Sequence, residues 1–142
     1  MGPDNQYRYN RVMIIEDSPV DRYIAVKLVE RNSFAREIVC METGTDAFSY
    51  LRSPENKDAF PDIILLDIWM PDINGFQFLD MFENLPEEQK KSCTIIMISS
   101  TADPRDHQKM KDNNNVFCFI HKPLTKEKLL SIGQPGSDKV CC

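Results

Sequence analysis

Short apolar runs alternate with longer segments of helical periodicity along most of this chain. Continuous apolar runs of this length are typical of parallel strands that are covered on both faces. Repeated rounds of strand and helix predict an α/β fold around a parallel sheet. The five runs are VMII, EIVCM, IILL, TIIMI and VFCFI, at residues 12–15, 37–41, 63–66, 94–98 and 116–120.

Periodicity and capping residues predict the intervening helices. Ser18 is a candidate N-cap, Pro19 suits the first helical position, and Val20, Ile24 and Leu28 form a stripe that we expect to face the core. The remaining helices are expected at residues 45–53, with Ala47, Phe48 and Leu51 on one face; 76–85, with Leu79 and Phe82; 99–115, with Met110 as the anchor; and 124–133, with Thr125 as the cap.

Carboxylates follow two of the predicted strands. Asp67 comes directly after Ile63–Leu66, although burying an unpaired carboxylate costs several kcal/mol or more. Glu16 and Asp17 follow the first strand in the same way. Right-handed crossovers favour adjacent first and third strands, and ligands of open parallel sheets bind beyond the carboxyl ends of the strands. We therefore expect the three acids to converge there.

Clustered carboxylates stay ionised together only if a cation offsets their charge, and an all-oxygen set suits Mg²⁺ or Mn²⁺. Ser99 follows the fourth apolar run and Lys122 the fifth, which adds a hydroxyl and an ammonium to the same edge. A cation, donors and a carboxylate nucleophile suit phosphoryl transfer, and Asp67 is the candidate acceptor. Each residue alone has a simpler explanation as a solvated strand end, helix-start acid, helix cap or surface lysine.

Composition narrows the class of protein. The chain has 142 residues, the size of one domain, and a net charge of −5, which argues against direct binding of nucleic acid or anionic membranes. No run reaches the length of a membrane span and the first residues lack the apolar region of a secretory signal, so a cytoplasmic protein is expected. Cys40 and Cys118 are predicted to be small buried apolar residues.

Four motifs in order, VMIIEDSPVDR, IILLDIWMPDINGFQFL, IIMISS and VFCFIHKPLT, resemble those of bacterial response-regulator receiver domains of the single-domain, chemotaxis-regulator type. The resemblance covers about residues 10–131. It implies a doubly wound, flavodoxin-like (βα)₅ fold with strand order 2-1-3-4-5. It also implies phosphotransfer from a sensor histidine kinase or histidine phosphotransfer protein, and a downstream protein target.

The resemblance also implies roles for particular residues. Asp67 corresponds to the phosphoacceptor, and Trp69 to the residue whose backbone carbonyl completes the metal shell. Ser99 and Phe119 correspond to the switch residues. The remaining positions that it matches are Glu16 and Asp17, the acidic pair that holds Mg²⁺; Lys122, which pairs with the phosphoryl group; and Pro123, after a cis peptide bond.

Residues 1–9 are expected to be an N-terminal extension, 10–132 the receiver domain, and 133–142 a flexible C-terminal tail. The predicted last helix is short because its apolar period breaks at Gly133 and Pro135, which favours a monomer or weak dimer. The protein is not expected to be an enzyme, apart from catalysing its own phosphorylation and slow dephosphorylation. Alternatives are a receiver-like binding scaffold without phosphotransfer, an aspartyl-phosphate phosphatase of the haloacid-dehalogenase type, and a flavodoxin-like nucleotide or flavin carrier.

Overall fold

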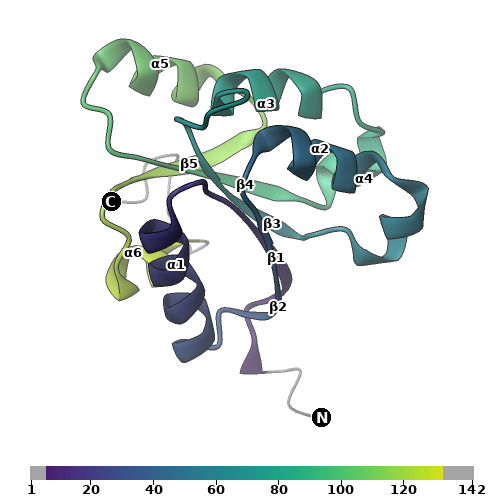
Figure 1. Ribbon diagram of the computed structural model, residues 1–142, viewed down its shortest axis with the longest axis horizontal. Helices are drawn as coiled ribbons and strands as arrows, with labels where there is room; N and C mark the ends of the chain where they lie inside the picture. The colour runs from purple at the N-terminus through teal and green to yellow at the C-terminus, as the bar shows by residue number, and fades with distance from the viewer. Residues whose placement is uncertain (1–5, 133–142) are drawn as a thin grey trace.

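Five parallel strands in the order β2-β1-β3-β4-β5 form the centre of the computed structural model, which describes residues 6–132 (Figure 1). The predicted fold class and strand order are confirmed. The strands are β1 (Tyr9–Ile15), β2 (Ala35–Met41), β3 (Ile63–Asp67), β4 (Thr94–Ser99) and β5 (Val116–His121). The helices are α1 (Pro19–Arg31), α2 (Gly44–Arg52), the 3₁₀ helix η2 (Pro54–Ala59), α3 (Gly75–Phe82), α4 (Glu87–Lys91), α5 (Pro104–Asp112) and α6 (Lys126–Ser131).

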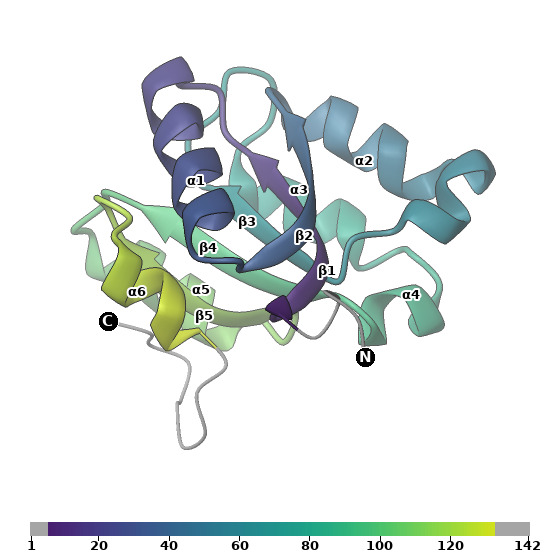
Figure 2. The same ribbon diagram turned by 90° about the horizontal axis from the view of Figure 1, so that it is seen from below.

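Helices cover both faces of the sheet (Figures 1 and 2). Successive side chains of a strand point to opposite faces. In β3, Ile63 and Leu65 therefore pack with α1 and α6, while Ile64 and Leu66 pack with α2, α3 and α5. All four are at most 1% exposed, so β3 lies at the centre of both cores. This double burial explains the continuous apolar run that the sequence displays.

The predicted core stripe of α1 is wrong for Val20 and Ile24, whereas Leu28 packs against the core. Ala25 and Val29 are the buried residues of this helix, whereas Val20 and Ile24 are 67% and 39% exposed and Leu28 is half-buried. Ser18 does cap the helix, since its side chain accepts a hydrogen bond from the backbone N–H of Asp21, and Pro19 is its first residue. The helix is rotated relative to the predicted stripe, and two polar residues, Asp21 and Arg22, take part in the inward-facing side.

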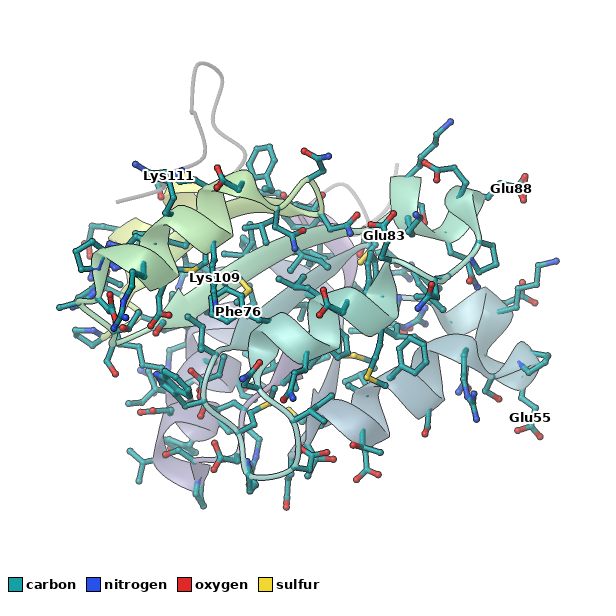
Figure 3. The ribbon with its side chains drawn as sticks, turned by 90° about the horizontal axis from the view of Figure 1, so that it is seen from above. Glu55, Phe76, Glu83, Glu88, Lys109 and Lys111 are labelled. Atoms are coloured by element: carbon teal, nitrogen blue, oxygen red, sulfur yellow. The ribbon has the colours of Figure 1, made fainter. Side chains whose placement is uncertain are left out.

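The other predicted helices exist, but the one expected at residues 99–115 is shorter, because Ser99 ends β4 and α5 covers only Pro104–Asp112. Phe78, Leu79, Phe82 and Leu85 are buried after β3, and Met110 anchors α5 as expected. The helix α4 was not predicted, because its sequence EEQKK has no apolar residue to give periodicity, and its Glu88 points away from the rest of the molecule (Figure 3). The strand β2 is at the edge of the sheet, so Cys40 is exposed rather than buried, while Cys118 is buried as predicted.

The Arg8 side chain joins the two ends of the described part of the chain. The strand β1 begins at Tyr9, and the Arg8 side chain donates hydrogen bonds to the carbonyl oxygens of Leu130 (3.0 Å) and Ile132 (2.8 Å). The expected tail, residues 133–142, lies outside the described residues. Within residues 6–132, none of the helices has both the length and the apolar character that crossing a membrane requires.

The parallel arrangement determines where the functional candidates meet. Glu16 directly follows β1, Asp67 ends β3, Ser99 ends β4 and Lys122 directly follows β5. These strands are neighbours in the sheet, so their carboxyl ends share one edge. Four chain segments that are remote in sequence therefore supply one site.

Candidate functional site

The three predicted acids come together at this edge. Glu16, Asp17 and Asp67 each offer an oxygen atom that lies within 4.8 Å of the other two. Glu16 and Asp67 are both only 6% exposed, while Asp17 is exposed. An oxygen-only set of carboxylates with one side open to water suits a hard divalent cation such as Mg²⁺, which keeps several water ligands. The donor chemistry thus fits the predicted metal.

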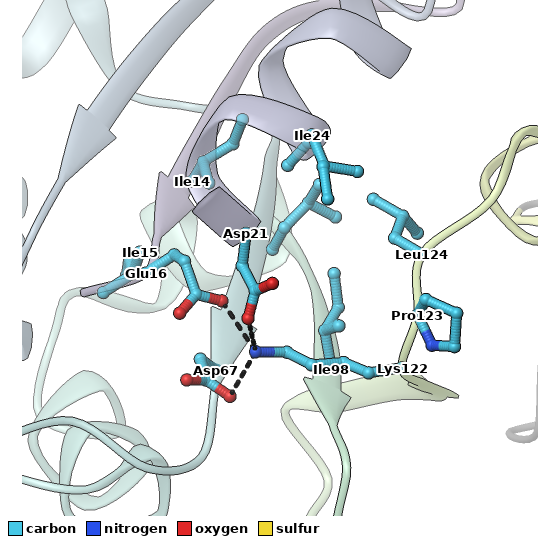
Figure 4. A pocket seen from close by; sticks show the side chains of 12 residues that line it. Ile14, Ile15, Glu16, Asp21, Ile24, Asp67, Ile98, Lys122, Pro123 and Leu124 are labelled. Atoms are coloured by element: carbon cyan, nitrogen blue, oxygen red, sulfur yellow. Dashed lines mark hydrogen bonds and ion pairs between the residues drawn. The ribbon is translucent and has the colours of Figure 1, made fainter. Parts of the chain in front are cut away.

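The ammonium of Lys122 lies among carboxylates (Figure 4). Its Nζ donates hydrogen bonds to Asp21 Oδ2 at 2.8 Å and to Glu16 Oε1 at 3.0 Å. The distance to Asp67 Oδ1 is 3.6 Å, which is an ion pair rather than a hydrogen bond. The backbone N–H of Lys122 is held by the carbonyl oxygen of Ser99 at 2.9 Å. The peptide bond between Lys122 and Pro123 is cis, as the resemblance implies.

The first turn of α1 positions Glu16. The backbone N–H of Ser18 donates to Glu16 Oε2 at 3.1 Å, and Arg22 Nη1 donates to the carbonyl oxygen of Glu16 at 2.8 Å. The backbone N–H of Glu16 is bound to the carbonyl oxygen of Met41 at the end of β2. Contacts on its N–H, carbonyl and carboxylate groups therefore fix the direction of this side chain.

Burial and charge perturb the ionisation of the site. Burial, followed by the negative charge of Glu16, raises the pKa of Asp67 to about 7, although Lys122 acts in the opposite direction. Burial by itself lowers the pKa of Lys122, but its hydrogen bonds to Asp21 and Glu16 outweigh that effect and raise the pKa above the usual value. A protonated lysine beside a carboxyl group that titrates near neutrality is typical of a reactive site rather than a passive strand end.

The two predicted switch residues lie on β4 and β5. Ser99 is 4% exposed, and its Oγ accepts a hydrogen bond from the backbone N–H of Thr101 at 3.0 Å. Phe119 is half-buried, and its ring centroid lies 4.7 Å from that of His107 on α5. His107 Nε2 is 3.0 Å from the carbonyl oxygen of Thr101. The rings thus connect β5, α5 and the loop after β4.

Two further residues shape the loop that follows Asp67. Trp69, two residues after Asp67, is 55% exposed and therefore open to solvent. Gly75, at the start of α3, donates its N–H to the carbonyl oxygen of Ile68 at 2.7 Å. A Cβ atom at Gly75 would lie 2.9 Å from the carbonyl oxygen of Asp67, so only glycine allows this approach without displacement.

Asp21 is the site residue that the sequence did not indicate. The sequence identifies Asp21 only as an acid in the first turn of a helix, where a negative charge is favourable in any protein. Its partner Lys122 is 101 positions away, so no local pattern reports the contact.

Comparison with known proteins assigns the family. The model of the response regulator receiver domain family matches residues 12–133. The chain belongs to the response regulator receiver family. Receiver domains of this kind are modules of two-component signalling, and they are generally signalling modules rather than enzymes.

The relatives include receivers of similar length. The chain is 30% identical to PilG of Pseudomonas aeruginosa, over 84% of this chain and 82% of PilG, and 27% identical to PilH of the same organism, over 84% and 91%. A two-component response regulator from Cytophaga hutchinsonii superposes with a TM-score of 0.76 at 28% identity, over 84% of this receiver and 90% of that chain. Other curated relatives are longer, and this receiver spans 58% or less of their length.

Proposed function

We propose that this receiver accepts a phosphoryl group on Asp67 from a phosphohistidine of a sensor kinase or phosphotransfer protein. A carboxylate oxygen of Asp67 attacks the phosphorus atom, an acyl phosphate forms, and the electron pair of the broken P–N bond remains on the imidazole. The observation that carries the proposal is the joint position of Asp67, the other two acids and Lys122 at one sheet edge. The exposed Asp17 and the buried Glu16 supply carboxylates that can hold a cation beside Asp67, the proposed acceptor.

Glu16, Asp17 and Asp67, together with the backbone carbonyl of Trp69, would hold Mg²⁺, or Mn²⁺ in its place. The ion, when bound, supplies positive charge to the oxygen atoms of the transferring phosphoryl group. Asp67 must be deprotonated to act as a nucleophile. With a pKa of about 7, the carboxyl group of Asp67 is partly protonated at neutral pH. A cation bound beside it lowers this pKa and therefore favours the reactive carboxylate.

Lys122 and Ser99 would stabilise the phosphorylated state. A phosphoryl group adds about −1.5 to −2 of charge and strong acceptor oxygens. The ammonium of Lys122 is already 3.6 Å from Asp67, and the hydroxyl of Ser99 lies at the end of the adjacent strand. Both groups then donate charge-assisted hydrogen bonds to the phosphoryl oxygens.

The output would be a changed protein-binding surface. Movement of Ser99 toward the phosphoryl group leaves space for Phe119 to rotate inward, away from His107. That rotation shifts a two-state equilibrium of the surface formed by α5, β5 and α6, and a downstream protein recognises the new state. We propose that the protein acts there as a monomer or weak dimer.

The three alternative functions fit the site less well. A haloacid-dehalogenase phosphatase requires an acid two residues after the nucleophile, and Trp69 occupies that position. A nucleotide or flavin carrier requires a phosphate-binding loop after the first strand, but Glu16 and Asp17 give that loop negative charge. A binding scaffold without phosphotransfer would leave the paired Lys122 and the perturbed Asp67 without a role.

The proposal is tested by incubation with acetyl phosphate and Mg²⁺, followed by intact mass measurement. The expected result is one adduct of the mass of a phosphoryl group on the wild type, none after Asp67→Asn, and none with a chelator present. Binding of beryllofluoride with Mg²⁺, followed by the fluorescence of Trp69, the single tryptophan, gives an independent readout. A wild-type protein that shows neither response would be a scaffold rather than a phosphoacceptor.

A further inference from the structure

Asp21 forms the shortest contact to the ammonium of Lys122, although it is not one of the three acids placed for metal binding. Its Oδ2 lies 2.8 Å from Lys122 Nζ, closer than Glu16 at 3.0 Å or Asp67 at 3.6 Å. Asp21 belongs to α1, whereas Lys122 follows β5 (Figure 4). The contact therefore crosses the site from a helix that supplies no metal ligand.

We infer that Asp21 is a positioning residue that holds Lys122 in a resting place and so weakens the affinity of the site for a phosphoryl group. This inference rests on the proposed function. An ammonium has only three N–H donors. In the resting protein two of them serve Asp21 and Glu16, and neither serves the phosphoacceptor. A phosphoryl group on Asp67 adds acceptor oxygens that compete with these two carboxylates for the ammonium of Lys122.

Exposure decides which partner yields. The side chain of Glu16 is 8% exposed, whereas that of Asp21 is 40% exposed. Releasing a buried carboxylate leaves an uncompensated charge, while a carboxylate open to water is solvated at little cost. Lys122 therefore exchanges Asp21, rather than Glu16, for the phosphoryl group. Because the lost pair is partly exposed, its removal changes affinity by a small factor rather than abolishing binding.

The local backbone holds Asp21 where it can do this. Ser18 Oγ accepts the N–H of Asp21 at 3.3 Å and fixes the first turn of α1. Ser18 in turn donates its own N–H to Glu16. The same turn thus positions Glu16, a proposed metal ligand, and Asp21, which competes for Lys122. Mutation of Asp21 alone removes the competition and keeps the metal ligand.

The chain offers a matched control. Asp46 lies in the first turn of α2, is exposed, and donates its N–H to Thr43 Oγ1 at 3.1 Å, the same capping relation that Asp21 has with Ser18. Asp46→Asn therefore removes one negative charge from an equivalent helix position without touching Lys122. Asp21→Glu keeps the negative charge at this partly exposed position.

The first measurement is beryllofluoride affinity in saturating Mg²⁺, read by Trp69 fluorescence, for wild type, Asp21→Asn, Asp21→Glu and Asp46→Asn. We expect Asp21→Asn to bind about two- to fivefold more tightly, with the other two variants close to wild type. Equal affinities of wild type and Asp21→Asn overturn the inference and leave the proposed function intact. An absence of binding by wild type overturns the proposed function itself.

The second measurement is independent of any bound group. The ¹H–¹⁵N signal of the Lys122 ammonium, assigned by its absence in Lys122→Ala, reports the hydrogen bonds of that group in the metal-free protein. We expect it to shift or broaden in Asp21→Asn and to stay in place in Asp46→Asn. An unchanged signal in Asp21→Asn overturns the resting pair, whatever beryllofluoride binding shows.

Discussion

The imidazole ring of His107 packs against the phenyl ring of Phe119, with 4.7 Å between the ring centroids and 37° between their planes. His107 is on α5 and Phe119 on β5, so this contact joins the helix to the strand that ends in the candidate site. The same imidazole is within hydrogen-bond distance of the carbonyl oxygen of Thr101. His107 therefore links Phe119 to the loop between β4 and α5.

His107→Ala is expected to lower the free energy of unfolding by about 1 to 2 kcal/mol, because it removes a ring contact and a hydrogen bond. His107→Phe keeps a ring beside Phe119 and loses only the hydrogen bond, so it should cost about 1 kcal/mol less. Urea denaturation of the three proteins measures both differences. Identical losses in the two variants would mean that the ring contact contributes nothing to stability.

The stability of the metal-free protein is expected to depend on pH through Asp67. Its folded-state pKa is raised from 3.8 to about 7, so between these values the folded state binds more protons than the unfolded state. The free energy of unfolding therefore falls as pH rises through this range, by about 2 kcal/mol after allowance for partial screening. The measurement is urea denaturation in a chelator at pH 5, 6, 7 and 8.

Asp67→Asn is the matched variant, because it keeps the shape of the side chain and cannot ionise. We expect it to be more stable than wild type at pH 8, and the difference to shrink toward pH 5. A difference that stays constant over this range would contradict the raised pKa. The same variant is expected to lose the proposed phosphorylation, so a gain in stability and a loss of function would both come from one carboxylate.

Strand ends were the most predictable part of the site. Each apolar run is continuous because both faces of the strand are covered, and it stops where a polar residue reaches the sheet edge, as Leu66 and Asp67 illustrate. Parallel topology then brings Glu16, Asp67 and Lys122 to that edge without any knowledge of side-chain packing. Fold and acidic cluster followed from the same hydrophobic pattern.

Contacts that depend on helix rotation were not predictable. Val20 and Ile24 were assigned to the wrong face of α1, because the inward side uses Ala25 and Val29 together with the site residue Asp21. A polar residue that forms a tertiary ion pair, such as Asp21, interrupts the apolar periodicity from which the buried face of a helix is predicted. The pair formed by Asp21 and Lys122 therefore appears only once the fold is known.

Added Mg²⁺ is expected to stabilise the wild type and to do so less in Glu16→Gln. A ligand that binds only the folded state at 100 times its dissociation constant adds about 2.7 kcal/mol. Glu16→Gln replaces one of the proposed charged oxygen ligands by a neutral amide, so its increase in melting temperature should be clearly smaller. Thermal denaturation with and without Mg²⁺ gives the comparison, and a chelator should reverse the effect.

Asp46→Asn serves as the control for charge, since it also removes one negative charge but does not belong to the cluster within 4.8 Å. It should retain the full increase caused by Mg²⁺. A similar loss in both variants would indicate general attraction of the ion to an acidic protein, which carries a net charge of −5, rather than a defined site.

Gly75→Ala is expected to disturb the site through the backbone of Asp67, the proposed phosphoacceptor. The new Cβ would lie 2.9 Å from the carbonyl oxygen of Asp67 and 3.0 Å from Cα of Ile68, both of them backbone atoms that cannot rotate away. Overpacking of this kind costs about 1 to 3 kcal/mol, and the higher helix propensity of alanine offsets only part of it. Beryllofluoride affinity should fall together with stability, because Asp67 must shift.

Gly44→Ala is the comparison, since its Cβ would meet only side-chain atoms of Ile73 and Met70. Ile73 is half-buried in the loop before α3, so its side chain can move, and we expect a smaller loss of stability with unchanged beryllofluoride affinity. Urea denaturation and a beryllofluoride titration on both variants separate the two glycines. Equal affinity in Gly75→Ala and wild type would show that the backbone after β3 tolerates displacement without moving the carboxylate.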